Sequence, residues 1–122
     1  MVLPIKRKWF DMILSGKKKE EYREIKPYYE TRFTNLFKMT MKDGKLIKIP
    51  DPFLEIQDTP VQTITFRNGY SNDSPMLEAE CTLSVGKGKS EWGAEPDKEY
   101  YILHIQRVRR RNEQKRDNTV FE

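Results

Sequence analysis

Apolar residues near the start of the chain recur with the spacing of a helix. They are Ile5, Trp9, Met12 and Ile13, with Phe10 and Leu14 widening the stripe. This pattern predicts a helix over about residues 5–15. Gly16 follows the last apolar position, where a glycine in the left-handed conformation ends many helices. A second amphipathic helix is predicted over about 28–38, with Pro27 suited to its first turn and an apolar stripe of Tyr29, Phe33, Leu36 and Phe37.

Between and after these helices the pattern favours extended chain. Strands are predicted over 19–25, 46–49, 61–67, 76–85 and 100–108. The segment 76–85 alternates most clearly, and its inward positions are Leu77, Ala79, Cys81, Leu83 and Val85. Asn68-Gly69 is a tight-turn signal, and the segment 100–108 is apolar enough to be buried on both faces.

This order of elements predicts an α+β fold. Two N-terminal helices precede a small, curled, mainly antiparallel sheet or β-barrel. The chain shows no internal repeat and no linker that would divide it. We therefore expect one domain over residues 1–108, followed by a basic, polar C-terminal tail over 109–122.

Composition narrows the class of protein. The chain has 122 residues and a mass of 14.6 kDa, and Lys and Arg exceed Asp and Glu to give a net charge of +4. A single cysteine excludes an internal disulfide and a cysteine-rich zinc site, and a single histidine excludes a histidine-rich one, so we expect no metal and no cofactor. No apolar run is long enough for a membrane span or a secretory signal. The sequence thus predicts a cytoplasmic protein with no membrane partner.

Residues 16–23, Gly-Lys-Lys-Lys-Glu-Glu-Tyr-Arg, carry the most informative cluster of charges. If a helix ends at Gly16 and a strand follows, Glu21 and Arg23 share one face of that strand and Lys18 leaves the turn before it. An ammonium, a carboxylate and a guanidinium would then lie within reach of one small ligand. The alternative is a solvated strand edge whose charges form weak surface pairs, each contributing about 0–1 kcal/mol.

The spacing Gly16-x-Lys18-x-x-Glu21-x-Arg23 resembles the G-x-K-x-x-E-x-R signature of the ASCH domain family. The resemblance extends over about residues 2–108, because the predicted order of helix, signature, second helix and strands is similar too. The segment Glu91–Pro96 and the run Tyr100–Ile105 also resemble small ASCH proteins of bacterial and phage genomes.

The resemblance implies a PUA-like β-barrel with a cleft between the barrel and the first helix, lined by the signature residues. Family members are taken to bind RNA or ligands that contain a nucleobase, one branch hydrolyses acetylcytidine to cytidine, and another has been described as a ribonuclease. In the amidohydrolase branch the catalytic set is a lysine, a threonine three residues later and a glutamate on a central strand. By motif these positions fall on Lys18, Glu21 and Glu80, so a carboxylate stands where the family's hydroxyl nucleophile would be.

This departure leaves binding as the favoured function. We expect an RNA or nucleoside partner, with Lys18 and Arg23 on phosphate or base and Glu21 or Glu80 accepting from an exocyclic amine. Tyr22, Tyr28 and Trp92 are candidates for stacking on a base, with packing as the alternative for Trp92. Tyr29 could stack too, but it lies on the apolar stripe of its helix and is interpreted as a packing residue. The alternatives are an amidohydrolase that acts on acylated cytidine or a related amide, with Lys18, Glu21 and Glu80 as catalytic residues, and a protein-interaction module that uses the aromatic surface.

Other candidate chemistry is weaker. Gly86–Ser90 ends like a phosphate-binding loop but follows no matching pattern, so it predicts a turn. His104 lies alone in an apolar strand and is interpreted as structural, and Cys81 as a small buried hydrophobe. The basic cluster Arg107–Arg111 fits either a surface that follows phosphates or a solvated tail.

Overall fold

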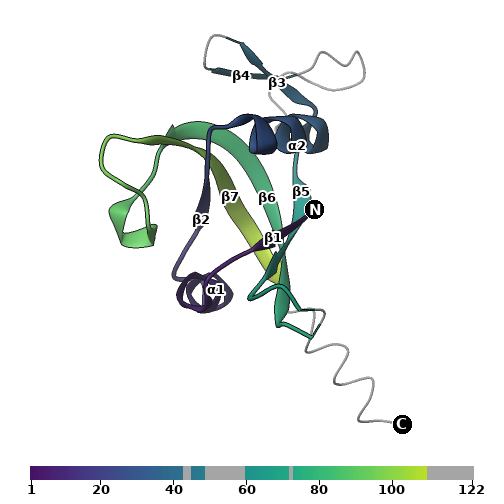
Figure 1. Ribbon diagram of the computed structural model, residues 1–122, viewed down its shortest axis with the longest axis vertical. Helices are drawn as coiled ribbons and strands as arrows, with labels where there is room; N and C mark the ends of the chain where they lie inside the picture. Colours follow the sequence, from purple (N-terminus) through teal and green to yellow (C-terminus); the bar gives the residue numbers. More distant parts are fainter. Residues whose placement is uncertain (43–44, 49–59, 72, 110–122) are drawn as a thin grey trace. The chain divides into compact units, whose positions relative to one another are not determined.

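The computed structural model describes residues 1–42, 45–48, 60–71 and 73–109. In chain order the elements are β1 (Val2–Pro4), α1 (Arg7–Leu14), β2 (Glu20–Glu24), α2 (Pro27–Phe37), β3 (Met39–Lys42), β4 (Lys45–Lys48), β5 (Gln62–Arg67), β6 (Met76–Lys87), the short 3₁₀ helix η1 (Ser90–Trp92) and β7 (Glu99–Arg109) (Figure 1). The α+β class with two helices is confirmed. The predicted tail lies outside the described residues from position 110 on, while residue 109 belongs to β7.

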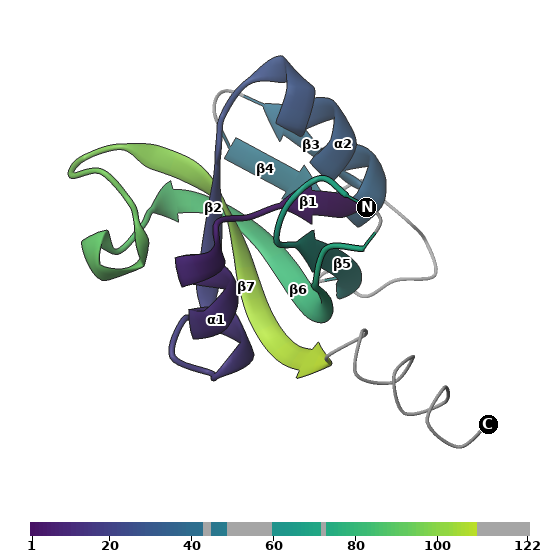
Figure 2. The same cartoon turned by 60° about the horizontal axis from the view of Figure 1, so that its bottom comes forward.

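Five of the strands form one mixed sheet in the order β1-β5-β6-β7-β2. β2 pairs antiparallel with β7, so that Glu20 lies opposite His104 and Tyr22 opposite Ile102. β1 pairs parallel with β5, a pairing that the prediction of a mainly antiparallel sheet did not include. β3 and β4 form a separate antiparallel pair that lies beside α2 (Figure 2).

The chain divides into two compact units built from interleaved segments. Unit 1 contains Met1–Lys19, Thr63–Cys81 and the chain from Ile105 on, and unit 2 contains Glu20–Gln62 and Thr82–His104. Neither unit is a continuous stretch of sequence. The strands β5, β6 and β7 each contribute residues to both units.

In unit 1 the core contains the apolar faces of α1, β5 and β6. α1 buries Phe10 and Ile13, which are three residues apart and so share one face of the helix. In the first half of β6, Leu77, Ala79 and Cys81 are buried as the alternation predicts.

In unit 2 an aromatic core joins α2 to β7. The Phe33 ring lies 5.7 Å from Tyr29, 6.5 Å from Phe37 and 5.5 Å from Tyr101, measured between ring centroids. Tyr100 to Leu103 are all buried, which confirms that β7 is covered on both faces there. Val85, expected to face the core, is only half-buried, since the burial pattern of β6 fades toward the strand end.

Candidate functional site

The end of α1 sets the position of Lys18. Gly16 has φ +84°, its N–H donates to Ile13 O at 3.1 Å, and the Lys17 N–H donates to Met12 O at 2.9 Å. This pair of bonds around a left-handed glycine is a Schellman motif, which satisfies carbonyls that a helix end leaves without partners. The Lys18 N–H adds a second bond to Met12 O at 3.0 Å. The backbone of Lys18 is therefore fixed by the helix itself.

The Lys18 side chain is fully buried, with 0% of its surface exposed. Its Nζ lies 5.1 Å from the centroid of the Trp9 ring, and Lys8 Nζ lies 4.6 Å from the same ring. An ammonium over an indole face is attracted by the ring quadrupole, and the attraction grows when the group is desolvated. The indole thus compensates part of what it costs to remove this charge from water.

A pocket of about 230 Å³ opens in unit 1 beside this turn. The residues that line it come from the end of α1, the turn after it and the last part of β7: Ile13, Leu14, Ser15, Gly16, Lys18, Lys19, Ile105, Gln106, Arg107 and Val108. Three of these side chains are cationic and none is acidic. The backbone holds the two walls together, since the Ile105 N–H donates to Lys19 O at 2.9 Å. A small anion or a phosphate group suits this lining.

Glu21 and Arg23 lie in unit 2 and contact each other. Arg23 Nη1 donates to Glu21 Oε2 at 2.7 Å and to the Tyr22 carbonyl oxygen at 2.8 Å. The two side chains are only 13% and 7% exposed for Arg23 and Glu21, respectively. The shared strand face is confirmed, and the pair is buried rather than a solvated surface pair. Removing one partner would leave a buried charge, which costs more than losing a surface pair does.

Tyr22 belongs to the core of unit 2. It is 8% exposed and clusters with Ala94, Tyr100 and Ile102, with a centroid distance of 5.5 Å to the Tyr100 ring. Burial raises the pKa of the Tyr22 hydroxyl well above its ordinary value, and the backbone N–H of Lys89 acts in the opposite direction. A base could stack on this ring only if these neighbours moved.

Trp92, the other predicted stacking residue, lies at the end of η1. It is half-buried against the same cluster, and Lys89 Nζ lies 4.7 Å from its ring centroid. Gly93 follows it with φ +99° and ends the short helix. The ring thus keeps part of its surface open to solvent.

Glu80 lines a second, small hollow in unit 1. Its volume is about 20 Å³, and its lining residues are Thr63, Glu78, Glu80, Arg107, Val108 and Arg109. Lys18 and Glu80 thus line different hollows, which share Arg107 and Val108. Arg107 lies in β7, within the strand predicted over 100–108, and the basic cluster that begins with it therefore starts on the sheet.

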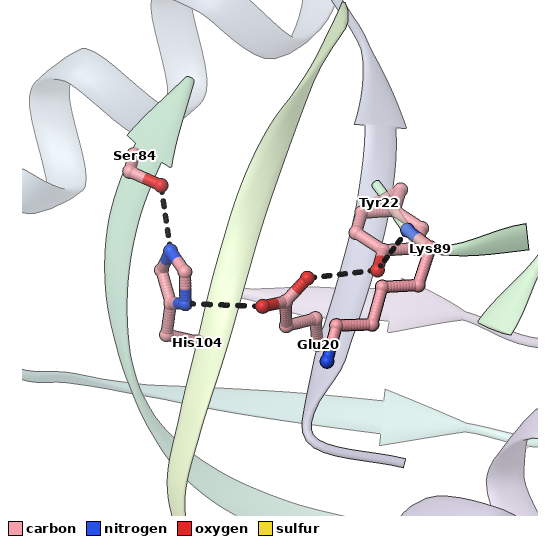
Figure 3. A network of polar contacts seen from close by, with 5 residues as sticks. All are labelled: Glu20, Tyr22, Ser84, Lys89 and His104. Atoms are coloured by element: carbon pink, nitrogen blue, oxygen red, sulfur yellow. Dashed lines mark hydrogen bonds and ion pairs between the residues drawn. The ribbon is translucent and has the colours of Figure 1, made fainter. Parts of the chain in front are cut away.

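A polar chain across β6, β7 and β2 is the feature that the sequence interpretation missed (Figure 3). Ser84 Oγ lies 2.6 Å from His104 Nε2, and His104 Nδ1 lies 3.7 Å from Glu20 Oε2. Tyr22 Oη donates to Glu20 Oε1 at 2.8 Å and accepts from the Lys89 N–H at 2.9 Å. All of these residues belong to unit 2. His104 was interpreted as an isolated structural histidine, because nothing in one sequence shows which strand lies opposite it.

Cys81 is a small buried hydrophobe as predicted: it is 0% exposed, and burial raises the pKa of its thiol to about 12. Within the described parts of the chain, no three His, Cys, Asp or Glu side chains are placed to share a metal ion. The helices of those same parts are all too short or too polar to cross a bilayer.

Comparison with known proteins gives no relative for this chain: no family model, no curated protein and no solved structure matches it.

Proposed function

We propose that this protein binds RNA or a modified nucleoside, and that the cationic pocket beside Lys18 receives the phosphate or another anionic part of the ligand. The observation that carries the proposal is the lining of that pocket by Lys18, Lys19 and Arg107 with no carboxylate among its residues. Its volume of about 230 Å³ suits a phosphate with part of a sugar or base. The excess of basic residues in the whole chain favours a polyanionic partner.

The signature supports the same ligand class. In this proposal Arg23 recognises a base or phosphate and Glu21 accepts from an exocyclic amine, as the ASCH resemblance and its PUA-like fold imply. The two groups are already paired at 2.7 Å, so their geometry is preorganised and little side-chain entropy is lost on binding. Trp92 remains the aromatic proposed to stack on a base, since it keeps exposed surface whereas Tyr22 is buried.

Binding is favoured over the amidohydrolase alternative for a reason of placement. Amide hydrolysis by this family's route needs its lysine and central-strand glutamate at one reacting centre. Lys18 and Glu80 line different hollows, and Glu21 is engaged by the Arg23 guanidinium.

The test is binding of a short, fluorescently labelled single-stranded RNA, followed by anisotropy over a salt series from about 50 to 200 mM. Lys19→Gln and Arg107→Gln each remove an exposed cation from the pocket, so each should weaken binding. Each should also reduce the slope of the logarithm of the binding constant against the logarithm of the salt concentration by about one. Lys17→Gln is the matched control, because Lys17 is exposed in the same turn and does not line the pocket.

Two further variants test the buried groups. Lys18→Met keeps the length of the side chain without its charge, and Arg23→Lys keeps the charge without the planar fork. Both should weaken binding while circular dichroism stays that of the folded protein. Equal affinity in the wild type, Lys19→Gln and Arg107→Gln would remove the pocket from the proposal.

A further inference from the structure

The polar chain in unit 2 places a serine, a histidine and a glutamate in the order found in the catalytic triads of serine hydrolases. A hydroxyl contacts an imidazole, and the imidazole faces a carboxylate on its other side (Figure 3). A serine becomes a nucleophile when a base lies within hydrogen-bond reach and a third group orients that base. The 2.6 Å distance between Ser84 Oγ and His104 Nε2 meets the first condition.

The sheet itself produces this alignment. The order β6-β7-β2 places the three strands side by side, and Glu20 is the register partner of His104. Directly opposed residues in an antiparallel pair extend from the same face of the sheet. Ser84 meets the imidazole from β6, so the three groups form a row across the strands, held by the backbone.

The carboxylate sets the tautomer of the imidazole. With Glu20 beside Nδ1, the proton of the neutral ring is favoured on Nδ1, which leaves the Nε2 lone pair to accept the Ser84 hydroxyl proton. The 3.7 Å distance from Nδ1 to Glu20 Oε2 is longer than a hydrogen bond. Such contacts are often loose without substrate and tighten when the imidazolium forms.

Two groups behind the carboxylate keep it in place. Tyr22 Oη donates to Glu20 Oε1 at 2.8 Å, and Tyr22 Oη is itself fixed by the Lys89 N–H at 2.9 Å. The Tyr22 ring is buried, so this support is rigid. Tyr22 and Glu20 are therefore positioning residues.

The row is also open to a small substrate. The side chains of His104 and Glu20 are 36% and 20% exposed, and Ser84 is half-buried. Solvent therefore reaches both the imidazole and the carboxylate.

We propose that Ser84, His104 and Glu20 form a nucleophile–base–acid triad that hydrolyses small carboxylic esters. This proposal is independent of ligand binding at Lys18, because none of Ser84, His104 and Glu20 lines that pocket.

The reaction balances without a co-reactant other than water. Ser84 Oγ attacks the carbonyl carbon as its proton moves to His104 Nε2; the ester C–O bond then breaks, and the leaving alkoxide takes the proton from Nε2. Water next attacks the acyl-Ser84 carbon and gives a proton to Nε2, and Ser84 leaves with that proton as the carboxylic acid is released. One ester and one water give one acid and one alcohol.

The first experiment treats the whole protein with a fluorophosphonate probe and maps the adduct by mass spectrometry. The adduct is expected on Ser84. Ser90→Ala, which removes an exposed serine of η1, is the matched control and should label like the wild type. Native wild-type protein that gains no adduct, or gains it on another residue, would refute the triad and leave the row a structural network.

The second experiment measures p-nitrophenyl acetate hydrolysis. Ser84→Ala should abolish the enzymatic rate, and His104→Gln should lower it by about 100-fold or more. Glu20→Gln keeps the shape of the side chain and removes its charge, so kcat should fall with KM little changed. If a folded Ser84→Ala variant hydrolyses the ester at the wild-type rate, the proposal is overturned.

Discussion

At the scale of single residues, Gly16 has the largest consequence for the proposed binding pocket. Its backbone has φ +84°, a region that an L-residue with a Cβ enters at a cost. The left-handed turn lets the Gly16 and Lys17 amides bond back to Ile13 and Met12, and it brings Lys18 to the end of α1. The turn at Gly16 therefore sets the backbone position from which the Lys18 side chain extends.

Substituting Gly16 with alanine should destabilise the fold by about 1 kcal/mol. A Cβ built on Gly16 has no heavy atom within 4 Å, so the expected loss comes from backbone strain and not from a clash. Gly16→Asn should lose less, because asparagine tolerates the left-handed region better. Urea unfolding followed by circular dichroism measures both; an alanine variant as stable as the wild type would contradict the left-handed cap.

At the scale of elements, the loop between β6 and β7 closes tightly over the Tyr22 side chain. A Cβ on Gly88 would lie 2.6 Å from Tyr22 Cζ and 2.7 Å from Ala94 Cβ, closer than atoms can approach. Two residues earlier, a Cβ on Gly86 would make an ordinary contact of 3.6 Å with Ile102 Cδ1. Gly86 lies at the end of β6 and Gly88 just beyond it, so an alanine at each position compares an open site with a filled one on the same segment.

Gly88→Ala should destabilise the protein by about 1–3 kcal/mol, since the added methyl overpacks the cluster around Tyr22. Gly86→Ala should stay within about 0.5 kcal/mol of the wild type. Thermal and urea unfolding of both variants compare them directly. If the two lose equal stability, the close approach of the loop to Tyr22 is wrong.

The elements also show what one sequence can predict. Both helices and the strands β2, β5, β6 and β7 follow from local periodicity, and each predicted range overlaps the observed one. β1 was missed because it has three residues, ends in Pro4 and pairs with a strand about sixty positions later along the chain. Such a pairing leaves no periodic trace in the sequence.

The candidate site divides in the same way. The contact between Glu21 and Arg23 follows from the two-residue period of a strand. The Ser84–His104 contact joins positions twenty apart, and it depends on the register of neighbouring strands, which alternation alone leaves open. In the sequence Lys18 stands in a run of charged residues, which is typical of an exposed segment. In the structure the turn after α1 and the contact with Trp9 leave its side chain buried, and neither can be read from the charge pattern.

At the scale of the whole molecule, two buried tyrosine hydroxyls and a buried cysteine thiol make the folding stability depend on pH in the alkaline range. Burial raises the pKa values of Tyr22, Tyr101 and Cys81 above the ordinary 10.0 of tyrosine and 9.0 of cysteine. In the unfolded chain these groups lose their protons near the ordinary values, whereas in the folded protein they keep them. Above about pH 9 the unfolded state thus binds fewer protons, and stability falls as the pH rises. Each group contributes a slope of at most about 1.4 kcal/mol per pH unit.

Tyr101 and Tyr22 separate this effect from hydrogen bonding. The Tyr101 hydroxyl is buried with no hydrogen-bond partner among the described residues, whereas the Tyr22 hydroxyl has partners in Glu20 and Lys89. Tyr101→Phe should therefore be neutral or stabilising at pH 7. It should also reduce the loss of stability between pH 9 and 11, because it removes a desolvated group that the unfolded state can ionise.

Tyr22→Phe should reduce the loss of stability over the same pH range. At pH 7, however, it should lower the free energy of unfolding by about 1–2 kcal/mol, since the Glu20 carboxylate loses a donor. Urea unfolding at pH 7, 9, 10 and 11 distinguishes the two; a Tyr101→Phe variant whose stability falls with pH as steeply as that of the wild type would show that this hydroxyl is not shielded from water.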